Sequence, residues 1–281
     1  MVNPLAMFGI ANWIWDIIAL VITFALIMVL IRLNDILRNR DKIPTYVSRK
    51  VFHTFAGPLF IICWLLFSGD LLSRYIAAIV PLIFAMLYVA VGTGVLKNEE
   101  FVQLLTRSGK SRELLFGNFL YCLVMVWVSI ACFFIPVDKF AGVPFIPTAI
   151  LVFGPMAGGD GLADMVGQKW GKHKFKVFSE KSVEGTLAML VFGFLFTYVM
   201  LAIFSIILNP VYPAVYSLMN LLIPVIAVSL VATVAEALSP RNIDNLVVPV
   251  CIFLVLGLFW YLKILGIITL YPSAIWNFTP V

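Results

Sequence analysis

The chain has 281 residues, of which 63% are hydrophobic and 12% charged, whereas an ordinary soluble domain has about 25% charged residues. Its mean hydropathy is +1.07. This composition excludes a soluble globular protein. Because one membrane crossing needs about 20 apolar residues, the length accommodates about eight crossings and no large soluble domain. The net charge of +5 is no sign of a nucleic-acid partner in a membrane chain, so we expect none.

The apolar runs predict an all-α, polytopic integral membrane protein in which residues 1–281 form a single transmembrane domain. All four cysteines lie inside such runs without the spacing of a zinc site, and we interpret them as small buried hydrophobic residues. The predicted spans are 13–33, 52–69, 73–96, 115–136, 143–159, 185–208, 213–236 and 246–268.

Charged residues predict the orientation of these spans. If the N-terminus is outside, the inside segments are 34–51, 97–114, 160–184 and 237–245. All but three of the 19 lysines and arginines then lie at or between the inside ends, the exceptions being Arg74, Lys139 and Lys263. Such asymmetry follows the positive-inside rule, so we expect both termini outside. All but three of the 14 acidic residues also fall inside, which predicts an active site at the cytoplasmic face.

The densest polar cluster runs from Gly158 to Lys172. If this run is helical, Asp160 and Asp164 lie one turn apart on one face. Two carboxylates at that spacing can share a divalent ion, and oxygen ligands with no nearby Cys or His pair favour Mg²⁺ over zinc. Because carboxylates at a membrane boundary are costly and usually serve a site, we predict that these two do so.

Glycines interrupt the same run, although each costs a helix about 1 kcal/mol relative to alanine. They suit close approach either to a ligand or to another helix, and helix packing alone explains them at least as well. Lysines that follow the run can offset phosphate charge, or they can simply orient the chain and contact lipid headgroups. Together with the two carboxylates, these features favour a site for a nucleoside triphosphate and its metal. The lysines are Lys172, Lys174, Lys176 and Lys181.

The run GDGLADMVG at 159–167 resembles a motif of phytol kinases, and KSVEGTLA at 181–188 is similar to the corresponding motif of dolichol kinases. Weaker similarities lie at 49–53, 108–117 and 236–246. The chain thus resembles the phytol kinase and dolichol kinase group of CTP-dependent membrane lipid kinases, which are related more distantly to CDP-diacylglycerol synthases. The resemblance covers about residues 46–256, with its core motif at 158–188.

This resemblance implies transfer of the γ-phosphate of CTP to the hydroxyl of an isoprenoid alcohol of the phytol, geranylgeraniol or dolichol type, with Mg²⁺ as cofactor. Other expected partners are the membrane lipids, because a long alcohol must enter from the bilayer. The location is the plasma membrane in a prokaryote and an endoplasmic reticulum or plastid membrane in a eukaryote. The oligomeric state stays open.

Roles are assigned to residues on the same basis. Asp160 and Asp164 are expected to hold the metal, and either Asp160 or Glu236 to accept the alcohol proton, so the catalytic set is Asp160, Asp164 and Glu236. The expected nucleotide-binding residues are Gly159, Gly161, Gly167, Gly171, Lys172, Lys181, Ser182, Glu184 and Gly185. Further candidates are Arg49, Lys50, His53, Arg112, Asp244 and Asn245.

Two other functions compete with a kinase. A cytidylyltransferase would make a CDP-lipid from the same CTP and Mg²⁺ and release pyrophosphate, but the C-terminal signature of CDP-diacylglycerol synthases is absent. An ion-coupled transporter would use Asp160 and Asp164 as a cation site, but no internal repeat is visible and the acids cluster at the inner boundary instead of at mid-membrane depth.

Overall fold

The computed structural model describes residues 3–40, 45–106, 109–133, 148–208, 218–240 and 243–264. The chain divides into two compact units, Met1–Ile130 and Ala131–Val281. Several predicted features lie outside the described residues: Lys139, and the parts of the predicted spans at 134–136, 143–147, 213–217 and 265–268.

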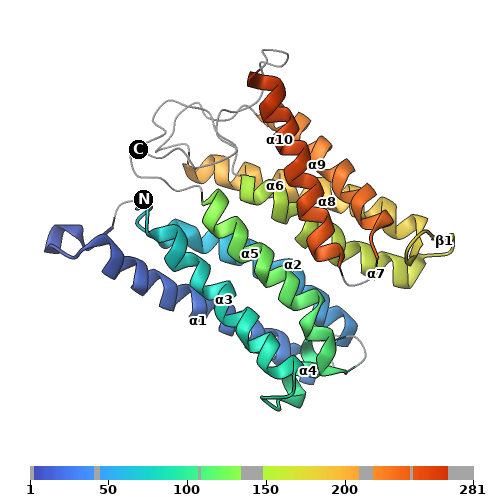
Figure 1. The fold of residues 1–281 in the computed structure, drawn as a ribbon, viewed down its shortest axis with the longest axis horizontal. Coiled ribbons are helices and arrows are strands. Elements are labelled where there is room, and N and C mark those ends of the chain that lie inside the picture. Colours follow the sequence, from blue (N-terminus) through green and yellow to red (C-terminus); the bar gives the residue numbers. More distant parts are fainter. Residues whose placement is uncertain are drawn as a thin grey trace. The chain divides into compact units, whose positions relative to one another are not determined.

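Helices account for nearly all of the described structure (Figure 1). The first unit holds α1 (Asn12–Asn39), α2 (Thr45–Cys63), α3 (Ser73–Gly92), α4 (Glu99–Leu105) and most of α5 (Gly117–Cys132), with 3-10 turns at Ala6–Phe8, Trp64–Leu66 and Ser111–Leu115. The second unit holds α6 (Thr148–Gly154), a π-helical segment (Pro155–Asp160), α7 (Gly161–Trp170), β1 (Lys174–Lys176), β2 (Glu180–Ser182), α8 (Val183–Leu208), α9 (Leu218–Leu238) and α10 (Asp244–Ile264).

Apolar helices occur at each of the predicted spans, which confirms a helical chain of membrane type. Within the described residues, 6 helical segments are long and apolar enough to cross a membrane, and α9 and α10 contribute shorter apolar stretches, Leu222–Leu238 and Asp244–Phe259. The number of crossings and their orientation stay predictions. One feature absent from the sequence-based prediction is the antiparallel hairpin of β1 and β2, in which Phe175 lies opposite Lys181.

Large exposed apolar side chains recur at helical spacing along α8, α9 and α10. In water such continuous apolar surface would be unfavourable, whereas it matches the hydrocarbon of a bilayer. We call these rows the lipid-facing stripes. They consist of Val183, Leu187, Val191, Leu195 and Val199 on α8, of Ile223, Ile226, Leu230, Val234 and Leu238 on α9, and of Leu246, Val250, Leu254 and Leu258 on α10.

Close helix packing joins α8 to the segment formed by α6, the π-helical residues and α7. A Cβ atom added to Gly154 would lie 2.7 Å from the Cα of Thr197, and one added to Gly158 would lie 2.3 Å from the Cβ of Phe196. Only glycine fits at such contacts. The small residues of this segment therefore bring its backbone against α8, as small residues do in many membrane helix pairs.

In the first unit, a buried carboxylate fixes the turn that precedes α3. Asp16 on α1 is fully buried and accepts hydrogen bonds from the backbone N–H of Ser68 at 2.7 Å, from Ser68 Oγ at 3.0 Å and from Ser73 Oγ at 2.6 Å. A buried charge is tolerated only when it is hydrogen-bonded in this way. Asp16 therefore has a structural role near the start of α1.

Replacing Asp16 with alanine is expected to lower the free energy of unfolding by about 2 kcal/mol, because Ser68 and Ser73 lose a charged acceptor inside the protein. Thermal unfolding in detergent measures this change. Asp70→Ala is the matched control, since Asp70 is exposed and the one described hydrogen bond to its side chain comes from the neighbouring Leu71 N–H. Equal unfolding temperatures for the two variants would contradict the structural role of Asp16.

Candidate active site

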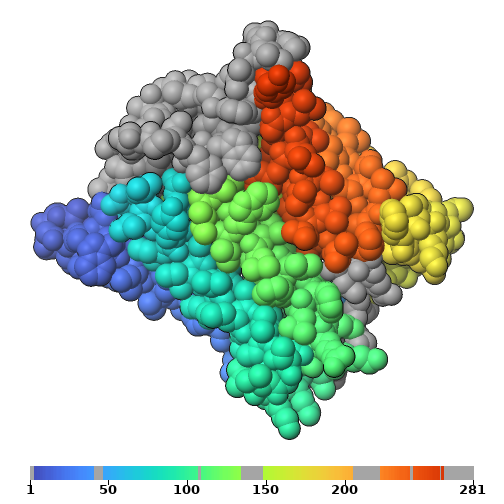
Figure 2. Space-filling view, viewed as in Figure 1, coloured from blue at the N-terminus to red at the C-terminus, as the bar shows by residue number. Residues whose placement is uncertain are grey.

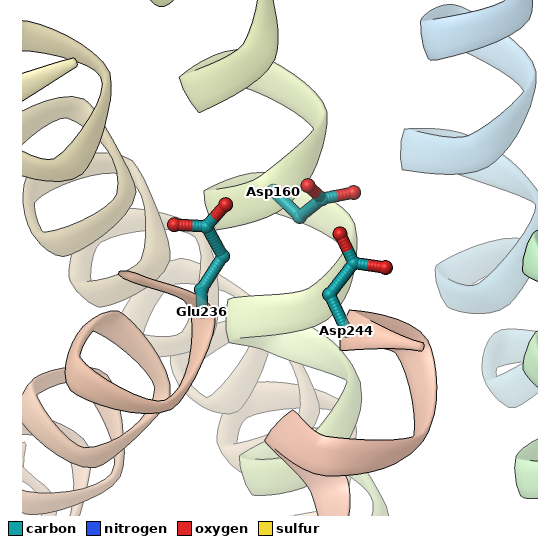
Figure 3. A group of neighbouring side chains, drawn as sticks. All are labelled: Asp160, Glu236 and Asp244. Carbon is teal, nitrogen blue, oxygen red and sulfur yellow. The ribbon is translucent and has the colours of Figure 1, made fainter. Parts of the chain in front are cut away.

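Three carboxylates from separate elements of the second unit converge. Asp160 is the last residue of the π-helical segment, Glu236 lies in the last turn of α9, and Asp244 is the first residue of α10. Each contributes an oxygen, and these oxygens lie within 4.8 Å of one another. Figure 3 shows the three side chains directed toward a common space. We call this group the acid cluster.

The local structure explains how the acid cluster is assembled. Ser239 directly follows α9 and closes its last turn. Its N–H and its Oγ both donate to the carbonyl of Glu236, at 3.2 and 2.9 Å. Asp244 then starts α10 and accepts from the N–H of Asn245 at 3.1 Å, at a helix N-terminus that favours negative charge. Asp160 is presented by a π-helical turn, a local widening that occurs often at functional sites.

Lys181 of β2 supplies a positive charge to the acid cluster. Its Nζ donates to Glu236 Oε1 and lies 3.9 Å from Asp244 Oδ2. Burial lowers the pKa of Lys181, but the carboxylates of the cluster outweigh burial, so its pKa lies above the ordinary value and the ammonium stays charged at neutral pH. One ammonium does not balance three ionised carboxylates, so the cluster has a net negative charge when ionised.

This arrangement fits a divalent metal ion of the hard type. The donor set consists of carboxylate oxygens alone, which is the set that Mg²⁺ prefers, and the residual negative charge of a half-buried group favours a cation. Asp160 is common to this set and to the predicted metal pair. The structure adds Glu236, which the sequence predicted as a possible acceptor of the alcohol proton, and Asp244, which it offered as a further candidate.

Asp164 occupies the helical position expected for it, one turn after Asp160 in the first turn of α7. It is half-buried, and it is not a member of the acid cluster. Spacing along one helix made Asp160 and Asp164 look like the natural pair. Tertiary contacts with α9 and α10 bring two other carboxylates, those of Glu236 and Asp244, within 4.8 Å of Asp160. Metal binding by Asp164 stays a prediction.

Several predicted nucleotide-binding glycines pack closely against neighbouring elements of the second unit. A Cβ atom on Gly171 would lie 2.6 Å from Ser182 Oγ, one on Gly167 3.0 Å from the same atom, and one on Gly185 3.3 Å from the Cα of Gly167. Gly159 lies against Met189, and Gly161 is buried at the start of α7. Of the two roles that the sequence left open for these glycines, close approach to another helix is displayed by the contacts of Gly159 with Met189 and of Gly185 with Gly167, while Ser182 belongs to β2.

The remaining predicted residues of this region lie around the hairpin. Ser182 is buried and its Oγ accepts from the N–H of Gly185 at 3.1 Å, which caps the start of α8. Glu184 pairs with Nδ1 of His173 at 2.7 Å. Lys172 is exposed between α7 and β1. Among the contacts of the described residues, Lys181 is the one predicted phosphate-binding lysine that reaches the acid cluster. Nucleotide binding by all of these residues stays a prediction.

Four further candidates belong to the first unit. Arg49, Lys50 and His53 lie on α2, where Lys50 is 5% exposed, and Arg112 lies exposed in the turn Ser111–Leu115. The ring of His53 packs on that of Tyr121 at 4.6 Å between centroids, and Tyr121 Oη donates to the carbonyl of His53 at 3.4 Å. His53 is therefore packed within the first unit, and a role for it in binding stays a prediction.

Comparison with known proteins finds plant phytol kinases. The chain is 34% identical over 230 residues to "Probable phytol kinase, chloroplastic" of Zea mays, covering 80% of this chain and 71% of that protein. It is 33% identical over 223 residues to "Phytol kinase 1, chloroplastic" of Arabidopsis thaliana, covering 78% and 68% respectively. The value is 28% over 242 residues for "Probable phytol kinase 2, chloroplastic" of Oryza sativa subsp. japonica, covering 85% and 75%. No family model and no solved structure matches the chain.

Proposed function

This chain belongs to the phytol kinase family, and from that membership we propose that it transfers the γ-phosphate of CTP to the hydroxyl of an isoprenoid alcohol within the membrane. The products are the lipid monophosphate and CDP. For a eukaryotic source, the names of the relatives favour a plastid membrane.

The acid cluster is the observation that supports this chemistry most strongly. Phosphoryl transfer needs charge neutralisation and in-line positioning more than covalent help from the protein. Asp160, Glu236 and Asp244 would hold Mg²⁺, which when bound neutralises phosphate charge. In the transfer, the alcohol oxygen forms a bond to the γ-phosphorus, the bond from that phosphorus to the bridging oxygen of CTP breaks, and Asp160 or Glu236 accepts the alcohol proton.

Lys181 has two tasks in this proposal. Its ammonium holds the carboxylates of Glu236 and Asp244 in place, and it offers a positive charge to phosphate oxygens. Ser182, the next residue, accepts a hydrogen bond from the Gly185 N–H and so keeps the start of α8 beside Lys181. These residues position the reacting groups, while the lysine also offsets the negative charge that a triphosphate brings.

The lipid-facing stripes support entry of the alcohol from the side. Each stripe begins or ends two residues from a charged residue of the site: Val183 follows Lys181, Leu238 follows Glu236, and Leu246 follows Asp244. Moving a long alcohol into water would cost about 0.8 kcal/mol for each exposed methylene group. An acid cluster next to lipid-facing surface avoids that cost, because only the hydroxyl has to reach the polar groups.

A direct assay tests the proposal. The purified protein in detergent, with Mg²⁺ and γ-labelled CTP, is expected to label one or more of phytol, geranylgeraniol and dolichol, and to leave diacylglycerol unlabelled. Unlabelled ATP, GTP or UTP in excess should compete less well than unlabelled CTP. Pyrophosphate release with a lipid phosphate as acceptor would instead identify a cytidylyltransferase, and the absence of both reactions would contradict nucleotide chemistry and favour transport.

A further inference from the structure

The hairpin between α7 and α8 connects two apolar segments that are each long enough to cross a membrane. The apolar segment Thr148–Trp170 ends just before it, and Val183–Phe204 begins just after it. At its base the N–H of Val183 donates to the carbonyl of His173 at 2.9 Å. A connection closed in this way cannot extend far from the membrane boundary.

The hairpin is also fastened to the end of α9. Ser179, which follows the tip, is buried and donates through Oγ to the carbonyl of Ser239 at 3.0 Å, and Lys181 on β2 pairs with Glu236. Figure 2 shows the hairpin region in yellow at the surface beside the orange atoms of α9 and α10. Its tip is therefore held beside the helix ends instead of projecting freely into water.

The tip exposes apolar side chains in an otherwise charged segment. Val177 is 51% exposed and Phe178 68% exposed, and Trp170 at the end of α7 is 56% exposed. Residues 169–182 carry five lysines and a single acidic residue, Glu180, which pairs with Lys174 at 2.8 Å. The surface thus combines exposed aromatic and aliphatic groups with an excess of positive charge.

We propose that the tip Val177–Phe178 inserts among the lipid headgroups and that the lysines around it bind the phosphates of anionic lipids. Three observations agree on this partner. The lipid-facing stripe of α8 extends to Val183, so exposed apolar surface continues up to the base of the hairpin. Aromatic side chains favour the interface, and lysines favour an anionic leaflet. The combination is that of an interfacial anchor.

Insertion of the tip Val177–Phe178 would fix the depth of the acid cluster relative to the membrane surface. Lys181 lies on β2, three residues after Phe178, and its ammonium contacts Glu236 and Asp244. Insertion of the tip would hold this strand, and with it Lys181, at the level of the headgroups. This inference depends on the membrane character of the chain and not on the proposed kinase activity, so either can fail without the other.

Spin labelling tests the anchor. A nitroxide is attached to Phe178→Cys in a Cys251→Ser background, since the other three cysteines are buried. The protein is reconstituted in nanodiscs of phosphatidylcholine alone or with one quarter phosphatidylglycerol. Labels at Leu195→Cys, on the lipid-facing stripe, and at Glu100→Cys, an exposed acidic position on α4, serve as references. Accessibility to oxygen is compared with accessibility to a water-soluble nickel complex.

We expect an oxygen-to-nickel ratio at position 178 several-fold above that at position 100 and below that at position 195, with a further rise when phosphatidylglycerol is present. Val177→Cys should give the same result independently. Lys176→Gln should reduce the rise caused by the anionic lipid. A ratio at 177 and 178 equal to that at 100 in both lipid mixtures would overturn insertion, and insertion without any effect of phosphatidylglycerol would overturn the lysine contacts.

Discussion

Replacing Asp160 with asparagine is expected to lower the rate of phosphate transfer to the alcohol by at least about 10²-fold, the loss seen when one charge-stabilising group is removed from an active site. Asp160 is the one residue shared by the acid cluster and by the metal pair predicted from helix spacing. The substitution keeps the size of the side chain and removes its charge, so membrane insertion should be preserved. The assay with γ-labelled CTP measures the rate.

Glu180→Gln is the matched control for this prediction. Glu180 is an acidic residue of the hairpin whose described ion pair is the exposed one with Lys174, and such pairs contribute little. Wild-type turnover in Asp160→Asn would refute a role of Asp160 in metal binding. Turnover lost equally in both variants would show that the loss is not specific to the acid cluster.

The same assay separates the two possible metal sets. If Asp160 acts with Glu236 and Asp244, then Glu236→Gln and Asp244→Asn should raise the Mg²⁺ concentration needed for half-maximal activity. If Asp160 acts with Asp164, then Asp164→Asn should raise that Mg²⁺ concentration and should also lower activity by at least about 10²-fold. The four single variants, titrated with Mg²⁺, therefore assign the ligands of the metal.

Replacing Lys181 with methionine is expected to lower the free energy of unfolding by about 3 kcal/mol and to reduce activity, because the carboxylate of Glu236 loses its partner inside the protein. The side chains of Lys181 and Glu236 are 17% and 8% exposed, so water replaces little of the lost interaction. Thermal unfolding in detergent at neutral pH measures the first effect. Lys181→Arg should restore stability better than methionine does, since it keeps the charge.

The pH dependence of this contribution has a defined sign. The pKa of Lys181 is raised in the folded protein, so its stabilisation is fully present below the ordinary lysine pKa of about 10.4 and is lost as the pH rises through the raised folded value. The difference in stability between wild type and Lys181→Met should stay constant from about pH 7 to pH 9. A difference that vanished within this interval would show that Lys181 is not the charged partner of Glu236.

Local sequence patterns anticipated most of the helices. Apolar runs in the sequence correspond to helices in the described structure. The hydrophobicity that favours a membrane helix is a property of the segment's own residues, so it can be read without knowledge of the tertiary contacts. Asp160 and Asp164 lie one helical turn apart, as their spacing predicted. The hairpin at Lys174–Ser182 was missed, since each strand has 3 residues and the alternating lysines show no apolar period.

The sequence by itself determined the membrane character of this protein, its helical segments and the region predicted to carry its chemistry, because composition and short-range spacing control all three. Only the tertiary structure decided which carboxylates meet. Asp160, Glu236 and Asp244 come from three elements, and their oxygens lie within 4.8 Å because helix packing in the second unit brings those elements together. Glycine contacts such as that of Gly154 with Thr197 set this packing, and they depend on a partner helix far away in the chain.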